Sequence, residues 1–176
     1  MPSRTALLRA FDRLEVDRTA LIAHLDTLPE NSLTTAPGPG AWTVAQVITH
    51  LAIAEESSLS YLRKKHDGGR HKPATFSSHW RLPLLNLALS LPLKYKAPAV
   101  VANVPATSYA EAKARWGAVR LDMRSTYGTL PEAHIGHDLF KHPTVGRFNL
   151  LQGLRFMQQH VRRHREQILR TLRAVA

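Results

Sequence analysis

Hydrophobic side chains recur at helical spacing in four segments of the chain. Steps of three, four and seven residues place them on one face of a helix. In the first segment this stripe consists of Leu7, Phe11, Leu14, Leu21, Leu25 and Leu28. In the third segment it consists of Ala112, Trp116, Val119, Met123 and Tyr127. Long helices with inward stripes of this kind predict an all-α protein that folds as a four-helix bundle.

Three of the four helices also carry a signal for where they begin. A capping box pairs the residue before the helix with a glutamine or glutamate three positions later. The pairs are Thr43 with Gln46, Ser108 with Glu111, and Asn149 with Gln152. We expect the second helix to end near His66, the third near Gly128, and the fourth almost at the last residue.

The longest connection joins the second and third helices, over roughly residues 67–107. A connection of this length is unusual in a compact bundle. We expect it to cross over the bundle and to contain a short extra helix around residues 82–91, in the apolar run "LPLLNLALSLPL". No internal repeat divides the chain, so a single domain over residues 1–176 is predicted.

Composition removes several classes of site and partner. The chain has no cysteine, so any metal must be bound by His, Asp or Glu, and we expect a cytoplasmic protein. The formal net charge is +11. The basic residues are spread along the chain without a nucleic-acid motif, so no specific nucleic-acid partner is expected. The most apolar run is about half the length of a bilayer crossing, so we expect no membrane span.

Two histidines four residues apart lie in the apolar stripe of the last helix. At about 100° per residue, His164 and Met157 fall within about 60° of His160, while several arginines lie on the opposite half. Neighbouring imidazoles on one helix face can bind a single ion. The alternative is a pair satisfied by hydrogen bonds in the core. A zinc-protease motif is excluded, because it requires Glu where the chain has Val161.

His50 supplies a third imidazole, from the apolar face of the second helix. Three inward histidines on two helices favour a metal site over hydrogen-bonded core histidines. Three protein ligands leave open coordination positions, which is typical of a reactive metal. Tyr61 shares the His50 face and is a candidate catalytic hydrogen-bond donor. Gln167 lies one turn after His164 and is a candidate to orient a ligand or water.

A second group of histidines precedes the last helix in "HIGHDLFKHP". His134, His137 and His142 could form another site with Asp138, although the segment has no regular period. His142 leads into the last helix and is a candidate to bind a cofactor at the mouth of the pocket.

Two stretches together resemble the DinB-like (YfiT-like) superfamily of metal-dependent proteins. They are "PGPGAWTVAQVITHLAIAEE" and, far downstream, "HPTVGRFNLLQGLRFMQQHVRRHREQI". The positions that match the family pattern are Trp42, His50, Leu51, His142, Pro143, Gly146, His160, His164 and Gln167. They occur in the right order over nearly the whole chain.

The resemblance implies a bundle of up-down-down-up type and a homodimer. It implies a mononuclear divalent metal, zinc or nickel before iron, bound by His50, His160 and His164. Activities of relatives are transfers that use glutathione, mycothiol or bacillithiol. The implied function is therefore a thiol S-transferase whose partners are a low-molecular-weight thiol and an electrophile.

Two other functions stay open. One is a metal-dependent hydrolase that uses water bound to the metal. It would need a general base, and Glu55 and Glu56 lie away from the predicted metal face. The other is a non-catalytic, stress-related bundle that binds a metal or a ligand.

Overall fold

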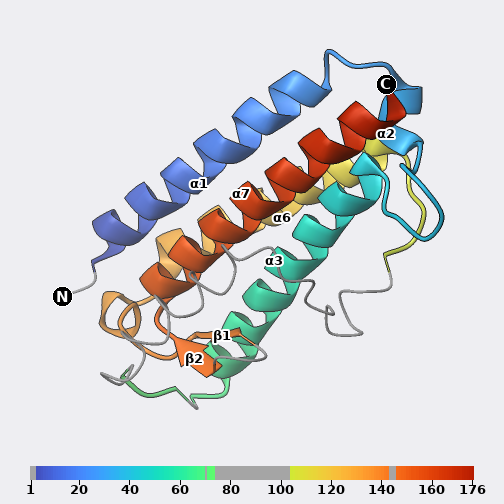
Figure 1. The fold of residues 1–176 in the computed structure, drawn as a ribbon. Coiled ribbons are helices and arrows are strands. Elements are labelled where there is room, and N and C mark those ends of the chain that lie inside the picture. The colour runs from blue at the N-terminus through green and yellow to red at the C-terminus, as the bar shows by residue number, and fades with distance from the viewer. Residues whose placement is uncertain (1–2, 70, 74–103, 143–145) are drawn as a thin grey trace.

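The computed structural model describes residues 3–69, 71–73, 104–142 and 146–176, and these contain four long helices (Figure 1). The helices are α1 (Arg4–Leu25), α3 (Val44–Asp67), α6 (Tyr109–Thr129) and α7 (Leu150–Val175). In Figure 1, α1 and α7 run in one direction and α3 and α6 in the other. The predicted four-helix bundle and its up-down-down-up order are thus confirmed. A short helix, α2 (Glu30–Thr34), follows α1, and a single 3-10 turn, η1 (Glu132–His134), follows α6.

All three predicted capping boxes form in both directions. In α7 the Asn149 side chain accepts a hydrogen bond from the backbone N–H of Gln152 at 3.0 Å, and the Gln152 side chain accepts one from Asn149 at 3.0 Å. The same reciprocal bonds begin α3 and α6. Because the first backbone N–H groups of a helix have no partner within it, these bonds fix where each helix starts.

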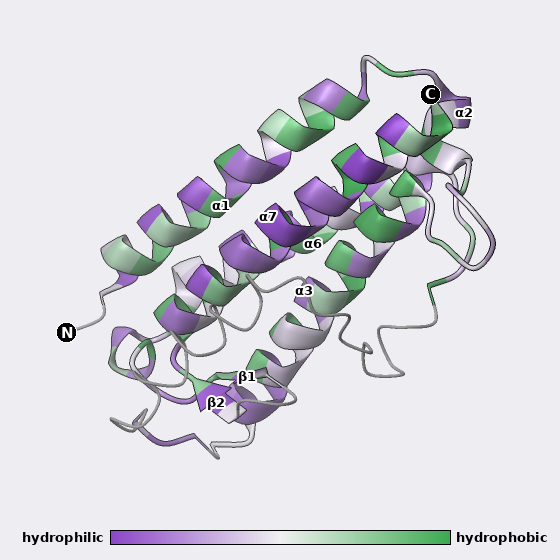
Figure 2. Cartoon of the chain, in the orientation of Figure 1, coloured by the Kyte–Doolittle hydropathy of each residue, from purple (hydrophilic) through white to green (hydrophobic). Residues whose placement is uncertain are grey.

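The predicted apolar stripes form the core between the helices. α1 and α3 each pack against α6 and α7. Leu7 and Phe11 of α1 and Trp116 and Met123 of α6 are at most 1% exposed. The face of α7 turned toward the reader in Figure 2 is mostly hydrophilic. The division of each helix into a buried and a solvated face follows the spacing in the sequence.

The long connection is described only in part. α3 ends at Asp67, one residue beyond the predicted end at His66, and Gly68 caps it. The extra helix expected around residues 82–91 lies outside the described residues.

A short antiparallel hairpin is present that the sequence did not predict. Strand β1 (Phe140–His142) pairs with β2 (Gly146–Phe148). Gly146 has φ +95°, a backbone conformation that glycine adopts without steric cost. The Phe140 ring packs directly on α7, where a Cβ on Gly153 would come within 2.6 Å of it. The hairpin is thus docked near the start of α7, ahead of the histidines.

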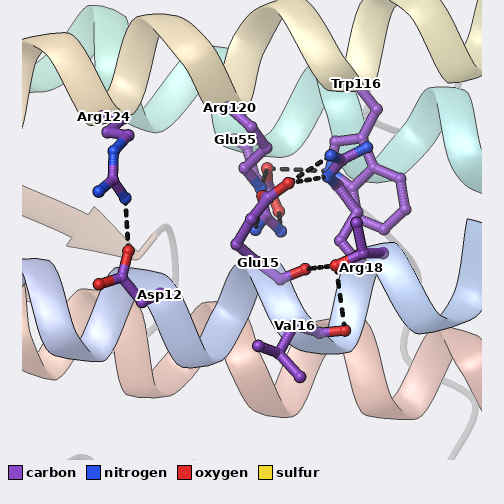
Figure 3. Close-up of polar contacts among 9 residues, drawn as sticks. Asp12, Glu15, Val16, Arg18, Glu55, Trp116, Arg120 and Arg124 are labelled. Carbon is purple, nitrogen blue, oxygen red and sulfur yellow. Dashed lines mark hydrogen bonds and ion pairs between the residues drawn. The ribbon is translucent and has the colours of Figure 1, made fainter.

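A buried ion pair joins α3 to α6 (Figure 3). Arg120 Nε and Nη2 lie 2.5 and 2.7 Å from the carboxylate oxygens of Glu55, and both side chains are 2% exposed. Trp116 Nε1 donates to the same carboxylate at 2.9 Å. Glu15 of α1 lies 3.4 Å from Arg120 Nη1. Since an unpaired charge is very costly in the interior, the three helices must keep their relative positions.

Replacing Glu55 with glutamine would leave the buried Arg120 without its main counter-ion. We expect the free energy of unfolding to fall by about 3–5 kcal/mol. Glu56→Gln is the matched control, because the adjacent Glu56 pairs with Arg115 at the surface, where the two side chains are 50% and 43% exposed. That change should cost only about 0–1 kcal/mol. Urea denaturation measures both, and equal losses would contradict the structural role of the buried pair.

Candidate metal site

Three imidazoles meet inside the bundle, between α3 and α7. His50 comes from α3 and is 4% exposed, and the half-buried His160 and His164 come from successive turns of α7. His160 Nε2 lies 3.4 Å from His50 Nε2 and 3.0 Å from His164 Nε2. The three ligand atoms all lie within 4.8 Å of one another. The structure therefore brings together the three histidines that the helix phase selected.

The spacing of these nitrogens fits a shared metal ion. Two nitrogens that each lie about 2.0–2.1 Å from a metal are about 2.9–3.4 Å apart at tetrahedral or octahedral angles. The two measured separations fall in that range. Neutral imidazoles suit zinc, nickel and iron, and three of them leave room for an exogenous ligand.

Electrostatics keep His164 in the form that binds metals. Burial, together with the neighbouring His50, lowers the pKa of His164 to about 3. His164 Nδ1 lies 2.9 Å from Gln167 Oε1. When the amide oxygen accepts a hydrogen bond from Nδ1–H, the Nε2 lone pair faces the other two imidazoles. Gln167, singled out from the sequence, thus orients one of the three rings.

Two aromatic rings hold the other two imidazoles in place. The Trp42 ring lies 5.1 Å from that of His50 between centroids. Phe156 stacks on His160 at 5.7 Å, with the ring planes only 13° apart. Phe156 was not among the residues predicted to belong to the site. Its position one turn before His160 was a usable signal, because residues four apart on a helix are neighbours.

A groove of about 700 Å³ opens beside the three histidines. It is lined by Pro37, Gly40, Ala41, Trp42, Gln167, Arg170, Thr171 and Ala174. Trp42 and Gln167 belong to both features, since each contacts one of the imidazoles. Arg170 adds an exposed positive charge. A molecule in the groove would therefore meet Arg170 and the two residues that contact the imidazoles, Trp42 and Gln167.

Tyr61, the other predicted catalytic residue, does not lie near the imidazoles. It is eleven residues beyond His50 on α3, or about 16 Å along the axis. Its hydroxyl is buried beside Arg147 and Asp138. Burial raises the pKa of Tyr61, and the charge of Arg147 opposes the rise. A catalytic role for Tyr61 stays a prediction.

His142, the predicted cofactor-binding residue, lies in β1 opposite Gly146. Its side chain is outside the part of the chain that the structure describes, so its role also stays a prediction. Among the described helices, none has both the length and the apolarity needed to cross a membrane.

Comparisons with known proteins agree with the fold. The sequence model of the DinB superfamily matches residues 13–168. YfiT from Bacillus subtilis, described as "a probable metal-dependent hydrolase with an unusual four-helix bundle topology", is 19% identical, with a TM-score of 0.57 over 98% of this chain and 89% of that one. A conserved protein from Enterococcus faecalis is 20% identical, with a TM-score of 0.52 over 98% and 94%. At these identities the likeness shows the fold alone. No curated protein matches the chain.

The buried state of His164 makes the stability of the metal-free protein depend on pH. The pKa of His164 is about 3 in the folded protein and 6.5 in a free side chain. Between these values the unfolded chain binds a proton that the folded chain does not, so stability falls as the pH is lowered from 7 toward 4. His164→Gln should flatten this dependence.

The measurement is urea denaturation of the metal-free protein at several pH values in that window. His24→Gln is the control, because His24 is exposed on α1 and should leave the slope as in the wild type. If His164→Gln has the wild-type slope as well, the neutral buried imidazole is contradicted.

Proposed function

The chain belongs to the DinB superfamily, and on that premise we propose that it is a metal-dependent thiol S-transferase. The proposal rests on one observation: three imidazole nitrogens meet near a groove that is lined by the positively charged side chain of Arg170. His50, His160 and His164 would hold the metal, with zinc or nickel preferred and iron as a further option. A divalent metal bound there would supply a positive charge that lowers the pKa of a thiol or water beside it.

The residues around the imidazoles have distinct tasks in this reaction. Gln167 keeps the His164 ring in the tautomer that faces the metal position. Trp42 forms one wall of the groove and holds His50. Arg170 would bind an anionic group of the thiol, such as a carboxylate. A groove of about 700 Å³ is within the usual range for sites that bind a small organic molecule.

The proposed reaction joins the thiol sulfur to an electrophilic carbon. A carbon–sulfur bond forms, the bond from that carbon to its leaving group breaks, and the thiol proton passes to solvent. A thiol has a pKa near 8–9, so a nearby positive charge is enough to ionise it at neutral pH. The cluster of possible metal ligands among the described residues contains no carboxylate. This favours a substrate that needs no separate general base.

A metal-dependent hydrolase is the second candidate. It is favoured by the description of YfiT as a probable metal-dependent hydrolase with the same kind of bundle. The same three imidazoles would then serve to activate water.

An assay of the metal-loaded protein separates these functions. We expect glutathione or another host thiol to displace chloride from 1-chloro-2,4-dinitrobenzene. His160→Ala should lose both the metal and the activity. The loss should exceed roughly 10–100-fold, which is the typical effect of replacing a residue that only hydrogen-bonds to a metal ligand. His24→Ala is the control and should retain both. Hydrolysis of p-nitrophenyl acetate without a thiol requirement would favour the hydrolase, and no turnover with either substrate would contradict an enzyme.

Arg170 tests the recognition of an anionic substrate. Arg170→Gln should raise KM for an anionic thiol about tenfold, which corresponds to about 1.4 kcal/mol, with little change in kcat. Arg173→Gln is the matched control, because Arg173 is also exposed on α7 but does not line the groove. Equal effects of the two changes would show that general surface charge, rather than the groove, attracts the thiol.

A further inference from the structure

Four other histidines gather at the opposite end of α3 from the metal site. We call them the four-histidine cluster: His66, His71, His134 and His137. His66 lies in the last turn of α3 and His71 follows that helix. His134 ends η1, and His137 follows the turn after it, in an isolated bridge with Pro73. His66, the member of the cluster that belongs to α3, is sixteen residues beyond His50, or about 24 Å along the helix axis. The cluster is therefore separate from the first site and cannot share an ion with it.

We propose that the four-histidine cluster is a second site for a divalent transition metal such as zinc. The proposal is independent of the function assigned to the first site. The sequence had suggested a second site of His134, His137 and His142 with Asp138. In the structure His66 and His71 join His134 and His137 instead, although they lie more than sixty residues earlier in the chain.

The rings of the cluster are spaced like those of the first site. In the first site the ring centroids lie 4.6, 4.7 and 5.3 Å apart. In the four-histidine cluster His71 lies 4.4 Å from His134 and 4.9 Å from His137. His134 lies 5.3 Å from both His66 and His137. His71, His134 and His137 thus lie as close to one another as the three rings of the first site, and His66 joins them at the edge, stacked on His71 at 6.0 Å.

The nitrogens of the cluster are only partly aligned. His71 Nδ1 and His137 Nδ1 face each other at 2.7 Å. Among the described residues, three donor atoms lie within 4.8 Å of one another only in the first site. Binding at the second site therefore requires rings to turn about their χ2 bonds. Each imidazole carries two nitrogens, so such a turn changes the donor it offers while the backbone stays in place.

The surroundings of the cluster favour binding of a metal ion over protonation of the imidazoles. His134 Nδ1 is buried without a hydrogen-bond partner, which is unfavourable unless a ligand binds it. Burial lowers the pKa of both His71 and His134, and the neighbouring histidines lower it further. The lowered pKa of these two imidazoles favours their neutral form, whose lone pairs are available to a metal. All four side chains are half-buried, so an ion can reach them from solvent.

Asp138 holds the two halves of the cluster together without being a ligand itself. Its carboxylate accepts a hydrogen bond from the backbone N–H of Lys72 at 2.8 Å, and Arg147 lies 3.2 Å from its other oxygen. The backbone N–H of Asp138 donates to the Lys72 carbonyl at 2.8 Å. These bonds keep His71 next to His137. A metal in the cluster would tie the end of α3 to the turn after α6.

The test is the zinc content of the tag-free full chain after metal removal and reloading with zinc alone. Elemental analysis should find two zinc ions per chain in the wild type and a loss of one in His71→Ala/His137→Ala. His160→Ala/His164→Ala should also lose one, and the four changes together should remove both. His24→Ala is the control and should keep both. If His71→Ala/His137→Ala binds as much zinc as the wild type, the second site is overturned.

A second measurement needs no variant that could fail to fold. The ring nitrogens of the wild-type histidines are followed by NMR during zinc titration. After the first equivalent is bound, the second should shift the ring nitrogens of His71, His134 and His137. Unchanged signals from these rings would overturn the proposal, even if the first site binds zinc as expected.

Discussion

The site depends on how α3 and α7 are oriented about their own axes. This orientation points three imidazoles into one apolar interface. An imidazole buried in an apolar interface costs folding free energy unless its nitrogens form hydrogen bonds or bind a metal. Thr43 lies seven residues before His50 and Asn149 lies eleven before His160, and the capping bonds of these two residues fix where α3 and α7 begin. A start shifted by one residue would turn the rings by about 100° and separate them.

The opposite face of α3 is held just as firmly. Glu55 lies five residues after His50, or about 140° around the helix. Its carboxylate binds Arg120 and Trp116 of α6, in the interior. α3 is therefore anchored to α6 on one side while it presents an imidazole to α7 on the other. A buried ion pair often adds little net stability, but breaking it is costly. We infer that here the pair contributes mainly to the relative placement of the helices.

The sequence predicted what depends on local periodicity and missed what depends on distant segments. Helix starts and the inward phase of His50 and His160 follow from spacing and caps. Phase placed Tyr61 on the same face as His50, but eleven residues separate the two side chains by three turns of α3, and the catalytic role of Tyr61 stays a prediction. Arg120 was missed, because its place in the stripe after Trp116 is unusual for a charge. The hairpin and the four-histidine cluster combine short segments without regular period, so the hairpin was missed, and the sequence suggested His134 and His137 of the cluster but not His66 and His71.

We infer that His50, His160 and His164 bind one metal ion. A crystal structure of the metal-loaded protein, with anomalous data at the zinc edge, tests this directly. We expect an anomalous peak at about 2.0–2.1 Å from a nitrogen of each ring, with at least one further position open to solvent. A fully loaded crystal with no peak between α3 and α7, and three imidazoles bonded to protein or water alone, would contradict it.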